Sequence, residues 1–393
     1  MKKEDIVIVG AARTPMGAML GELSSVSSPR LGAAAIAAAV QRAGVKPEQV
    51  DEVIMGCVLS AGLGQAPARQ AALAAGLPNS VPCTTVNKMC GSGMKAVMLA
   101  WDQLKAGSGE LMVAGGMESM SQAPYLLPKA RAGLRMGHAS LQDHLFLDGL
   151  EDAYEGGLMG SFAQRTADQF AIGRTAMDDF ALKSLARAQH AMAEGHFVTE
   201  ITPVKVDTRD GTILMNIDEQ PGNARPDKIP HLKPAFSKDG TITAANSSSI
   251  SDGAAALVMT TLTRAQALDL TPQARVLAHA THARLPAEFT LAPVGAINEL
   301  LNKVGWQAEE VDLYEINEAF AVVTLLAIAE LGLDENKVNV NGGACALGHP
   351  IGASGARILV TLIHALRQRG LSKGVAALCI GGGEATAVAL ELI

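Results

Sequence analysis

Aromatic and charged residues are both scarce in this chain of 393 residues. Phe, Tyr and Trp together make up 3% and charged residues 18%, whereas hydrophobic residues make up 48%. This composition excludes a disordered chain and predicts a sizeable core built from Ala, Val, Ile, Leu and 16 Met. Basic residues are fewer than acidic ones, 32 against 39, and the net charge is −7. That balance argues against general nucleic-acid binding, which requires a basic face, but it does not exclude one small anionic ligand.

Cysteine is sparse, and long apolar runs are missing. The five cysteines form no CxxC or Cys/His metal spacing, and their odd number does not fit a disulfide framework, which indicates a reducing compartment. The longest apolar runs, 31–40 and 320–329, are about ten residues long, short of the roughly 18 that a bilayer span requires. The first residues, Met-Lys-Lys-Glu-Asp, lead into a strand and have no pattern of a secretory leader. We therefore expect a cytoplasmic protein without a membrane span.

Apolar spans of strand length alternate with Ala- and Leu-rich helical patterns. Segments 6–9 and 111–114 have the length of buried strands, and segments 31–40 and 94–104 place apolar residues at helical spacing. This alternation predicts an α/β fold with largely buried sheets. The stretch 123–249 differs, because it is richer in charge, Pro, Met and His and has weaker periodicity. We expect an inserted region of loops and short helices there.

Three short motifs recur in the same order, roughly 262 residues apart. We infer two duplicated α/β halves, with the atypical segment inserted in the first. In each half we expect a Ser-Gly turn that opens a helix and a strand that ends in a glycine-rich turn; a pseudo-twofold would bring these turns together. The matched segments are 47–51 with 308–312, 92–95 with 354–357, and 113–118 with 379–384. The expected domains are residues 1–122 with 250–272, residues 123–249, and residues 273–393.

Cys90 precedes Gly-Ser-Gly, and an apolar helical face begins at Met94. This order places the thiol at a strand-to-helix junction, near the positive end of a helix dipole. Such a position can lower a thiol pKa from about 8.5 into the range of about 3.5–7.5 and make the thiolate a nucleophile. A small buried cysteine before a tight turn is the plain alternative, and the motif by itself leaves both interpretations open.

His349 lies in the glycine-rich segment 341–355. So much glycine permits backbone geometries that other residues avoid, and lets a ligand approach closely. The following Pro350 fixes the entry into an apolar helix, so an imidazole held there is able to take a proton from a thiol. A histidine that only caps the loop is the alternative.

Two further candidates, Cys379 and Asn317, follow or end predicted strands. Cys379 ends the strand 375–378 and precedes Ile-Gly-Gly-Gly, whose N–H groups are suited to an oxyanion hole. A cysteine at a strand end is more often structural, but the repeat places its turn opposite the matching turn of the other half. Asn317 follows the strand 311–316 and opens an apolar helix, where it either caps the helix or holds a water or a substrate oxygen.

Several long motifs in one order resemble those of the thiolase family, and the resemblance covers essentially the full chain. The resemblance is greatest to the acetyl-CoA C-acetyltransferases. It implies a layered αβαβα fold of two duplicated halves with an inserted loop domain. The motifs are Asn87-Lys-Met-Cys-Gly-Ser-Gly, Gly115-Gly-Met-Glu-Ser-Met, Ser251-Asp-Gly-Ala-Ala, Asn317-Glu-Ala-Phe, Gly342-Gly-Ala-Cys-Ala-Leu-Gly-His-Pro and Cys379-Ile-Gly-Gly-Gly.

The resemblance also implies a role for each reactive residue. Cys90 would be the nucleophile that carries the acyl group as a thioester, and His349 would activate it. Cys379 would exchange a proton with C2 of the second acetyl-CoA. Asn317 would hold a water that completes one oxyanion hole with His349, and the backbone N–H groups of Cys90 and Gly381 would form the other. No metal and no cofactor is implied, because the coenzyme A thioesters are substrates.

In the family, the loop domain covers the pantetheine arm of coenzyme A. Plain packing would also explain each of the matching residues, so the sequence leaves both interpretations open. Three basic residues of the insert, Arg225, Lys228 and Lys233, are candidates for local positive charge toward this anionic ligand, with a solvated face as the alternative. The matching positions are Leu150, Met159, Ala235, Phe236, Ala244 and Ser248, with Ala319 and Phe320 closing the pocket.

Two positions depart from the family pattern near the expected site. Leu158 stands where many relatives have His, which removes a polar group near the acyl-binding end and leaves the chain-length preference open. Glu384 follows the three glycines where relatives commonly have a small or apolar residue. A carboxylate near Cys379 would raise the pKa of that thiol, whereas a carboxylate that points outward would leave it unchanged.

The expected function is that of an acetyl-CoA C-acetyltransferase, which condenses two acetyl-CoA reversibly to acetoacetyl-CoA and CoA through an acyl-cysteine. The alternative within the class is a 3-ketoacyl-CoA thiolase that degrades longer chains. Other classes offer a cysteine hydrolase that uses Cys90 and His349, or a non-catalytic acyl-CoA-binding protein. The resemblance further implies a role in fatty acid metabolism and a homotetramer built as a dimer of dimers. The basic segment 126–138 is a candidate tetramer contact or a mobile flap.

Overall fold

A ten-stranded sheet runs through the computed structural model, which describes residues 4–209 and 211–393. Its strands are β1 (Ile6–Arg13), β2 (Gly17–Ala18), β3 (Glu52–Gly56), β4 (Cys83–Val86), β5 (Leu111–Ser119), β10 (Ser251–Thr261), β11 (Ala274–Ala283), β12 (Leu313–Ile316), β13 (Lys373–Ile380) and β14 (Glu384–Leu392). They follow the order β12-β13-β14-β11-β1-β10-β5-β3-β4, and β2 pairs with β10. β1 pairs antiparallel with β10 on one side and with β11 on the other, so it joins the two halves of the chain.

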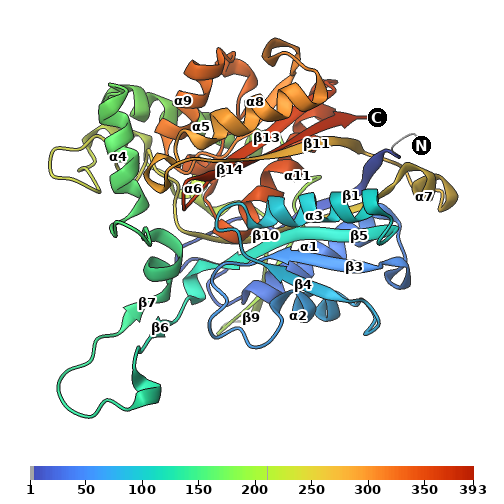
Figure 1. The fold of residues 1–393 in the computed structure, drawn as a ribbon, viewed down its shortest axis with the longest axis horizontal. Helices are drawn as coiled ribbons and strands as arrows, with labels where there is room; N and C mark the ends of the chain where they lie inside the picture. The colour runs from blue at the N-terminus through green and yellow to red at the C-terminus, as the bar shows by residue number, and fades with distance from the viewer. Residues whose placement is uncertain (1–3, 210) are drawn as a thin grey trace.

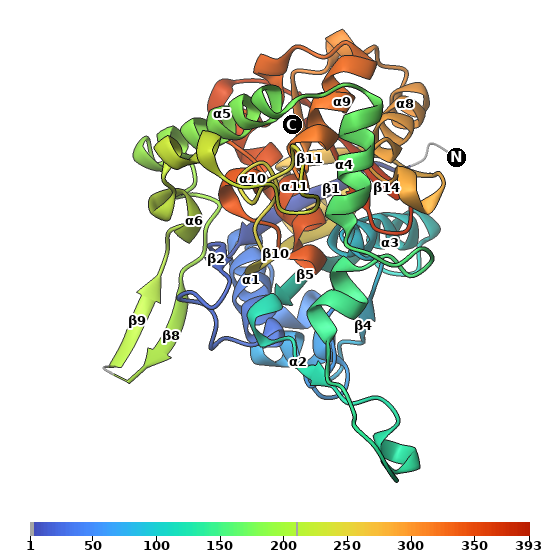
Figure 2. The same cartoon turned by 90° about the vertical axis from the view of Figure 1, so that its left-hand side faces the viewer.

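Helices and strands form five layers (Figures 1 and 2). The sheet supplies two of these layers, because its two halves pack on opposite sides of the central helices. The helices of these layers are α1 (Ser28–Ala43), α2 (Pro67–Ala74), α3 (Ser92–Ala106), α8 (Ala292–Val304), α9 (Ala321–Leu331) and α11 (Ile351–Arg369). α1 and α2 share a core with β1, β3, β5 and β10, whereas α8 and α9 share one with β11 to β14. α3 and α11 lie between, in a core that takes side chains from strands of both halves. The predicted αβαβα architecture is confirmed.

The central strands are apolar on both faces because helices cover both. In β1, Val7 and Val9 belong to the core beneath α1, while Ile6 and Ile8 belong to the core around α3 and α11. Successive strand side chains point to opposite faces, so an uninterrupted apolar run fills two cores at once. This is the physical reason why short continuous runs, and not an alternating pattern, marked the strands in the sequence.

The two repeated Ser-Gly motifs meet where α3 crosses α11. A Cβ atom on Gly93 would lie 2.9 Å from the backbone N of Ala356, and a Cβ on Gly355 would lie 2.5 Å from the backbone N of Met94. Both glycines therefore permit a close approach of the two helix backbones that a larger residue would prevent. The two matching motifs come together as predicted, but Ser354 and Gly355 lie within α11, which begins at Ile351, and not in a turn before it.

The expected turn at Gly115 and Gly116 is wrong. β5 continues through both glycines to Ser119, and both residues are fully buried. A Cβ on Gly115 would lie 2.1 Å from the carbonyl oxygen of Ala255, and a Cβ on Gly116 would lie 2.0 Å from that of Gly352. These glycines make room for the neighbouring strand and for α11, so close packing and not chain reversal explains them.

The chain between β5 and β10 forms an irregular region beside the layers. Its elements are β6 (Tyr125–Leu126), β7 (Gln142–Asp143), α4 (Met159–Gln169), α5 (Arg174–Ala193), β8 (Val204–Thr208), β9 (Gly211–Met215) and α6 (Glu219–Asn223); α7 (Leu262–Ala267) and α10 (Ala344–Leu347) lie elsewhere. The arm with β6 and β7 projects from the body in both views (Figures 1 and 2). α5 has 20 residues and is longer than the short helices expected. The prediction missed its length because Ala and Ser on its buried face weaken the hydrophobic periodicity of the sequence.

The composition of the helices also bears on membranes. Among the described residues, no helix combines the length and the apolar character needed to cross a bilayer.

Candidate active site

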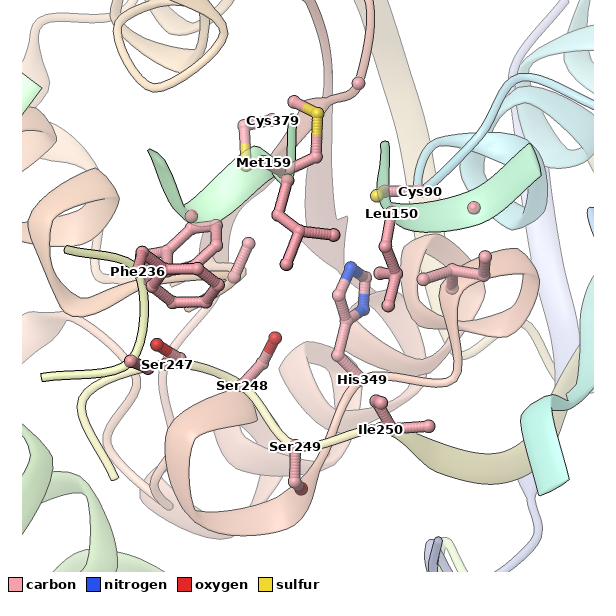
Figure 3. Close-up of a pocket in the computed structure, with 18 of the residues that line it drawn as sticks. Cys90, Leu150, Met159, Phe236, Ser247, Ser248, Ser249, Ile250, His349 and Cys379 are labelled. Atoms are coloured by element: carbon pink, nitrogen blue, oxygen red, sulfur yellow. The ribbon is translucent and has the colours of Figure 1, made fainter. Parts of the chain in front are cut away.

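One pocket of about 370 Å³ brings together most of the predicted reactive residues. Cys90, His349, Cys379 and Gly381 all line it. Figure 3 shows the imidazole of His349 projecting into the pocket from one side, with the thiols of Cys90 and Cys379 on the other. The residues expected to cover a pantetheine arm line the same pocket: Leu150, Met159, Ala235, Phe236, Ala244, Ser248, Ala319 and Phe320.

Several lining residues were not predicted. Gly160 directly follows the predicted residue Met159, and a Cβ on Gly160 would lie 2.3 Å from the ring of Phe236. A glycine at this position in the sequence could therefore have indicated a close contact. Ser247 and Ser249 flank the predicted residue Ser248, so the same sequence segment could have indicated them. Phe146 and Phe289 come from separate segments with no local pattern that could have marked them. The unpredicted lining residues are Phe146, Gly149, Gly160, Ser247, Ser249, Ile250, Phe289 and Ile351.

Cys90 sits in the strained turn between β4 and α3. The preceding residue, Met89, has φ +46°, a left-handed conformation that is uncommon for a residue with a side chain. Asn87 Oδ1 accepts from the Met89 N–H at 2.9 Å, and Ser92 Oγ accepts from the Lys88 N–H at 2.8 Å while donating to the Met89 carbonyl at 2.6 Å. These bonds compensate the strain and fix the position of the thiol.

The thiol of Cys90 does not have the lowered pKa that the junction suggested. Burial raises its pKa to about 11, because the low-dielectric surroundings disfavour a thiolate. The backbone N–H groups of Gly381 and of Cys90 itself act in the opposite direction, and burial outweighs them. α3 begins at Ser92, two residues after Cys90, as predicted, and the negative charge of Glu118 adds to the effect of burial. In the free protein Cys90 is therefore a neutral thiol.

His349 lies between α10 and α11, is 5% exposed, and is held by Ser354. The distance between His349 Nδ1 and Ser354 Oγ is 2.5 Å, and Ser354 Oγ donates its proton to the Pro350 carbonyl at 3.0 Å. Because the hydroxyl has one proton, Nδ1 must be the donor, and Nε2 keeps a free lone pair. Nε2 has no hydrogen-bond partner among the described residues.

The electrostatic surroundings keep the imidazole neutral. Burial lowers the pKa of His349 to about 3, and the positive charge of Arg357, on the same helix α11, lowers it further. A neutral ring with Nδ1 protonated presents a base toward the pocket. At rest Nε2 carries no proton, so His349 can accept one there when a reaction supplies it.

Cys379 and Gly381 lie at the end of β13, where three glycines turn the chain into β14. Gly382 and Gly383 have φ +94° and +88°, so this turn requires glycine. The N–H of Gly381 acts to lower the pKa of the Cys90 thiol. Burial, followed by the neighbouring Cys90, raises the pKa of Cys379 well above its ordinary value. The predicted glycine-rich turn is confirmed in this half.

Asn317 does not line the pocket, but it is buried two residues before Ala319, which does. The residue is 1% exposed, and its N–H donates to the carbonyl of Ala377, two residues before Cys379. Neither Oδ1 nor Nδ2 has a hydrogen-bond partner in the described part of the chain. The N-cap of α9 is Phe320, so of the two alternatives left open for Asn317, the one in which it caps this helix is wrong. Both polar atoms remain able to bind a water or a substrate oxygen.

Glu118 is a buried carboxylate near the site to which the sequence had assigned no role. Its two oxygens accept from the N–H groups of Val58, Leu59 and Gly352 at 2.9, 3.1 and 2.9 Å. It thereby ties the turn after β3 to the first turn of α11, which follows His349. Burial raises the pKa of Glu118 to about 7. Its occurrence inside a glycine-rich strand motif was the available signal.

The departures from the family pattern have different surroundings. Leu158 lines the pocket, as does Met159. Glu384 forms an ion pair with Lys88, and Cys379 owes its raised pKa to burial and to Cys90. The interpretation in which Glu384 points away from Cys379 is thus favoured.

Basic residues of the insert lie in an adjoining pocket of about 350 Å³. Arg225 and Lys228 line it, whereas Lys233 does not. Ala244 and Ser249 line both pockets, so the two hollows are neighbours. No group of three or more His, Cys, Asp or Glu side chains able to hold a metal occurs in residues 4–209 and 211–393.

A layered α/β chain with two thiols, an imidazole and glycine N–H groups around one apolar pocket has the parts of an enzyme that transfers acyl groups. Comparison with known proteins agrees. The family model described as "Thiolase, N-terminal domain" matches residues 6–263, and "Thiolase, C-terminal domain" matches residues 270–392. The chain belongs to the thiolase family, and its members are acyltransferases.

Relatives match over nearly their whole length. The acetyl-CoA acetyltransferase of Cupriavidus necator is 50% identical over 98% of this chain and 99% of its own, and acetyl-CoA acetyltransferase 2 of Arabidopsis thaliana is 51% identical over 99% and 97%. The crystal structure of the Bacillus anthracis acetyl-CoA acetyltransferase superposes with a TM-score of 0.97 at 41% identity, covering 100% of this chain and 99% of that one. A thiolase of Ascaris suum in complex with coenzyme A gives 0.94 at 43% identity, covering 99% and 100%.

Proposed function

We propose that this protein is an acetyl-CoA acetyltransferase, which condenses two acetyl-CoA to acetoacetyl-CoA and free CoA and also catalyses the reverse reaction. The observation that carries the proposal is the convergence of Cys90, Cys379 and His349 on one apolar pocket. A hydrolase needs one thiol and one base, whereas a condensing enzyme also needs a second group to remove a proton from carbon. The names of the relatives at about half identity support the same assignment.

In the first step Cys90 accepts an acetyl group. Its sulfur attacks the thioester carbonyl of acetyl-CoA, while Nε2 of His349 takes the thiol proton and passes it to the departing CoA sulfur. The N–H groups of Cys90 and Gly381 bind the carbonyl oxygen as it becomes negative. Each such donor contributes roughly 2.7–4 kcal/mol to the transition state. Because burial keeps Cys90 protonated at rest, the thiolate forms only during the attack.

In the second step a carbon–carbon bond forms. The thiol proton of Cys379 passes to His349 Nε2, and the thiolate so formed removes a proton from C2 of the second acetyl-CoA. The enolate oxygen is then held by His349 Nε2–H and a water on Asn317. The enolate carbon attacks the acetyl carbonyl on Cys90, the C–S bond breaks, and the proton on His349 Nε2 moves to the Cys90 sulfur, while Cys379 keeps the proton taken from C2. The buried, partnerless Oδ1 and Nδ2 of Asn317 support this assignment, since both can bind the water.

The apolar wall supports a short acyl substrate. Leu158 and Met159 line the pocket together with the two thiols, and Phe236 packs edge-on against Phe320 with ring centroids 6.0 Å apart. The ring of Phe236 already packs against the backbone of α4 at Gly160, so it has no room to move further toward this helix. We therefore expect thiolysis to favour acetoacetyl-CoA, and a preference for ketoacyl chains of six carbons or more would instead assign a degradative 3-ketoacyl-CoA thiolase.

The test separates the roles of the two thiols. Cys379→Ala should still become acetylated on Cys90 when mixed with acetyl-CoA, as detected by peptide mass spectrometry, while condensation falls by about 10²–10⁴-fold. Cys83→Ala is the matched control, since Cys83 lies at the start of β4 and does not line the pocket. Undiminished condensation by Cys379→Ala would refute the mechanism, and absence of acetylation in the native protein would refute acyl transfer through Cys90.

The remaining assignments follow from the family. We propose a cytoplasmic homotetramer, a dimer of dimers, that acts in fatty acid metabolism without a cofactor. The domain division into residues 1–122 with 250–272, 123–249 and 273–393 stays a prediction. Light scattering coupled to size exclusion measures the assembly, and deletion of residues 127–141, the exposed arm, should yield a dimer if this arm is the tetramer contact.

A further inference from the structure

The turn that carries Cys90 and the turn that carries Gly381 come from opposite halves of the fold, and two contacts join them. Gly91 packs against Ile380, since a Cβ on Gly91 would lie 2.4 Å from Ile380 Cδ1. The ammonium group of Lys88 forms an ion pair with the carboxylate of Glu384. The two contacts lie on either side of Gly381, which lines the same pocket as Cys90 and whose N–H lowers the pKa of the Cys90 thiol.

The glycine turn depends on what holds its two ends. Three successive glycines have no side chains to pack, and glycine has the largest conformational freedom of any residue. On the β13 side, Ile380 is buried against Gly91. On the β14 side, the Gly383 carbonyl accepts from the Arg284 N–H at 2.8 Å, and the next residue is Glu384. Glu384 is therefore the first residue with a side chain after the three glycines.

Lys88 is rigidly linked to the nucleophile. Its N–H donates to Ser92 Oγ at 2.8 Å, and its carbonyl accepts from the Gly91 N–H at 3.0 Å. The backbone of Lys88 is thus part of the same strained turn as Cys90. An ion pair from Lys88 to Glu384 consequently fixes the distance between the Cys90 turn and the glycine turn.

The pair has little to do with stability or with substrate contact. Lys88 and Glu384 are 22% and 36% exposed, and partly exposed ion pairs contribute little to folding. Neither residue lines the pocket. A small displacement of a catalytic donor, by contrast, costs a large factor in rate, because the donor must meet an oxygen at hydrogen-bond distance.

We propose that the Lys88–Glu384 ion pair is a clasp that holds the Gly381 N–H in register with the Cys90 sulfur, so that Lys88 and Glu384 are positioning residues for acyl transfer. This inference rests on the proposed function, because it assigns the Gly381 N–H to the oxyanion hole. It also explains why an acidic residue follows the three glycines in a chain that has lysine two residues before its nucleophile.

The experiment measures acetylation of Cys90 by S-acetyl-pantetheine in single turnover. This neutral thioester lacks the phosphates of CoA, so salt acts on the protein and not on the charge of the probe. Glu384→Gln and Lys88→Met should each slow acetylation roughly fivefold at low salt without lowering the thermal midpoint. The native rate should fall toward these values in roughly 1 M salt, where charges are screened, while the variants do not respond. The exchanged pair Lys88→Glu with Glu384→Lys should recover most of the rate.

Glu335→Gln is the matched control. It breaks an ion pair between Lys183 and Glu335, whose side chains are 38% and 41% exposed and whose charged atoms lie 2.9 Å apart. Neither residue lines the pocket, so this variant should leave the acetylation rate and its salt response unchanged. Native-like rates in both single variants, or an exchanged pair that folds but stays slow, would overturn the clasp. A native protein that acetylates Cys90 at no measurable rate overturns the proposed function instead, so the two failures are distinguishable.

Discussion

Replacing Ser354 by Ala removes the hydroxyl that holds the imidazole of His349 in its tautomer. The hydroxyl accepts from Nδ1 at 2.5 Å, and His349 is 5% exposed, so Ala leaves a buried donor without that partner. A buried polar group that loses its partner costs about 1–3 kcal/mol. The bond strengthens as Nε2 gains a proton and the ring becomes positive, so the loss falls mainly on the transition state.

The expected result is a 5- to 150-fold lower acetylation rate of Cys90, since about 1.36 kcal/mol corresponds to a factor of ten. Ser354 does not line the pocket, so KM for acetyl-CoA should change little. Stopped-flow release of CoA thiol measures the rate constant, and urea unfolding measures stability. We expect the unfolding free energy to fall by only about 1 kcal/mol.

Thr361→Val is the control for the loss of a buried hydroxyl on the same helix. Thr361 Oγ1 donates to Glu200 at 3.2 Å, neither residue lines the pocket, and Val keeps the shape of Thr. This variant should lose similar stability and retain its acetylation rate. If Ser354→Ala stays within twofold of Thr361→Val, orientation of His349 by Ser354 is refuted.

Three further predictions concern the thiol, the halves and the acyl end. Because burial raises the pKa of Cys90 to about 11, alkylation of its peptide by iodoacetamide should rise about tenfold per unit between pH 7 and 10; a plateau below pH 8 would reveal a preformed thiolate. Gly355→Ala should lower the unfolding free energy in urea by about 1–3 kcal/mol, since its Cβ would lie 2.5 Å from the backbone of α3. Gly222→Ala, which meets open space, should change it by less than about 0.5 kcal/mol. Leu158→Ala should raise kcat/KM for 3-ketohexanoyl-CoA relative to acetoacetyl-CoA roughly tenfold, and an unchanged ratio would show that Leu158 does not limit the acyl end.

The architecture was predictable because its determinants are local. Buried strands and amphipathic helices leave patterns within ten or so residues, and the repeat revealed the pseudo-symmetry that brings Gly93 and Gly355 together. Gly115 and Gly116 misled the prediction, because the same residue type serves a turn and a close backbone contact. Only the neighbouring strand and α11 distinguish the two uses.

The candidate site was predictable where a motif contains its own chemistry. Cys90 and His349 stand next to glycines and Cys379 stands two residues before three of them, and all three residues line one pocket. Asn317 was found by its motif, but its unsatisfied amide emerged only from the packing around it. Ser354 lay inside a recognised repeat, yet its bond to His349 depends on the first turn of α11.

The sequence by itself determined the layered fold and the family and predicted the candidate reactive residues, since these follow from patterns along the chain. The tertiary structure decided their protonation states and their partners. Burial left Cys90 a neutral thiol and His349 a neutral base, against the expectation from the helix dipole, because desolvation sums over all surrounding atoms. The clasp between Lys88 and Glu384 joins residues from opposite halves of the chain, and their proximity is a property of the folded molecule alone.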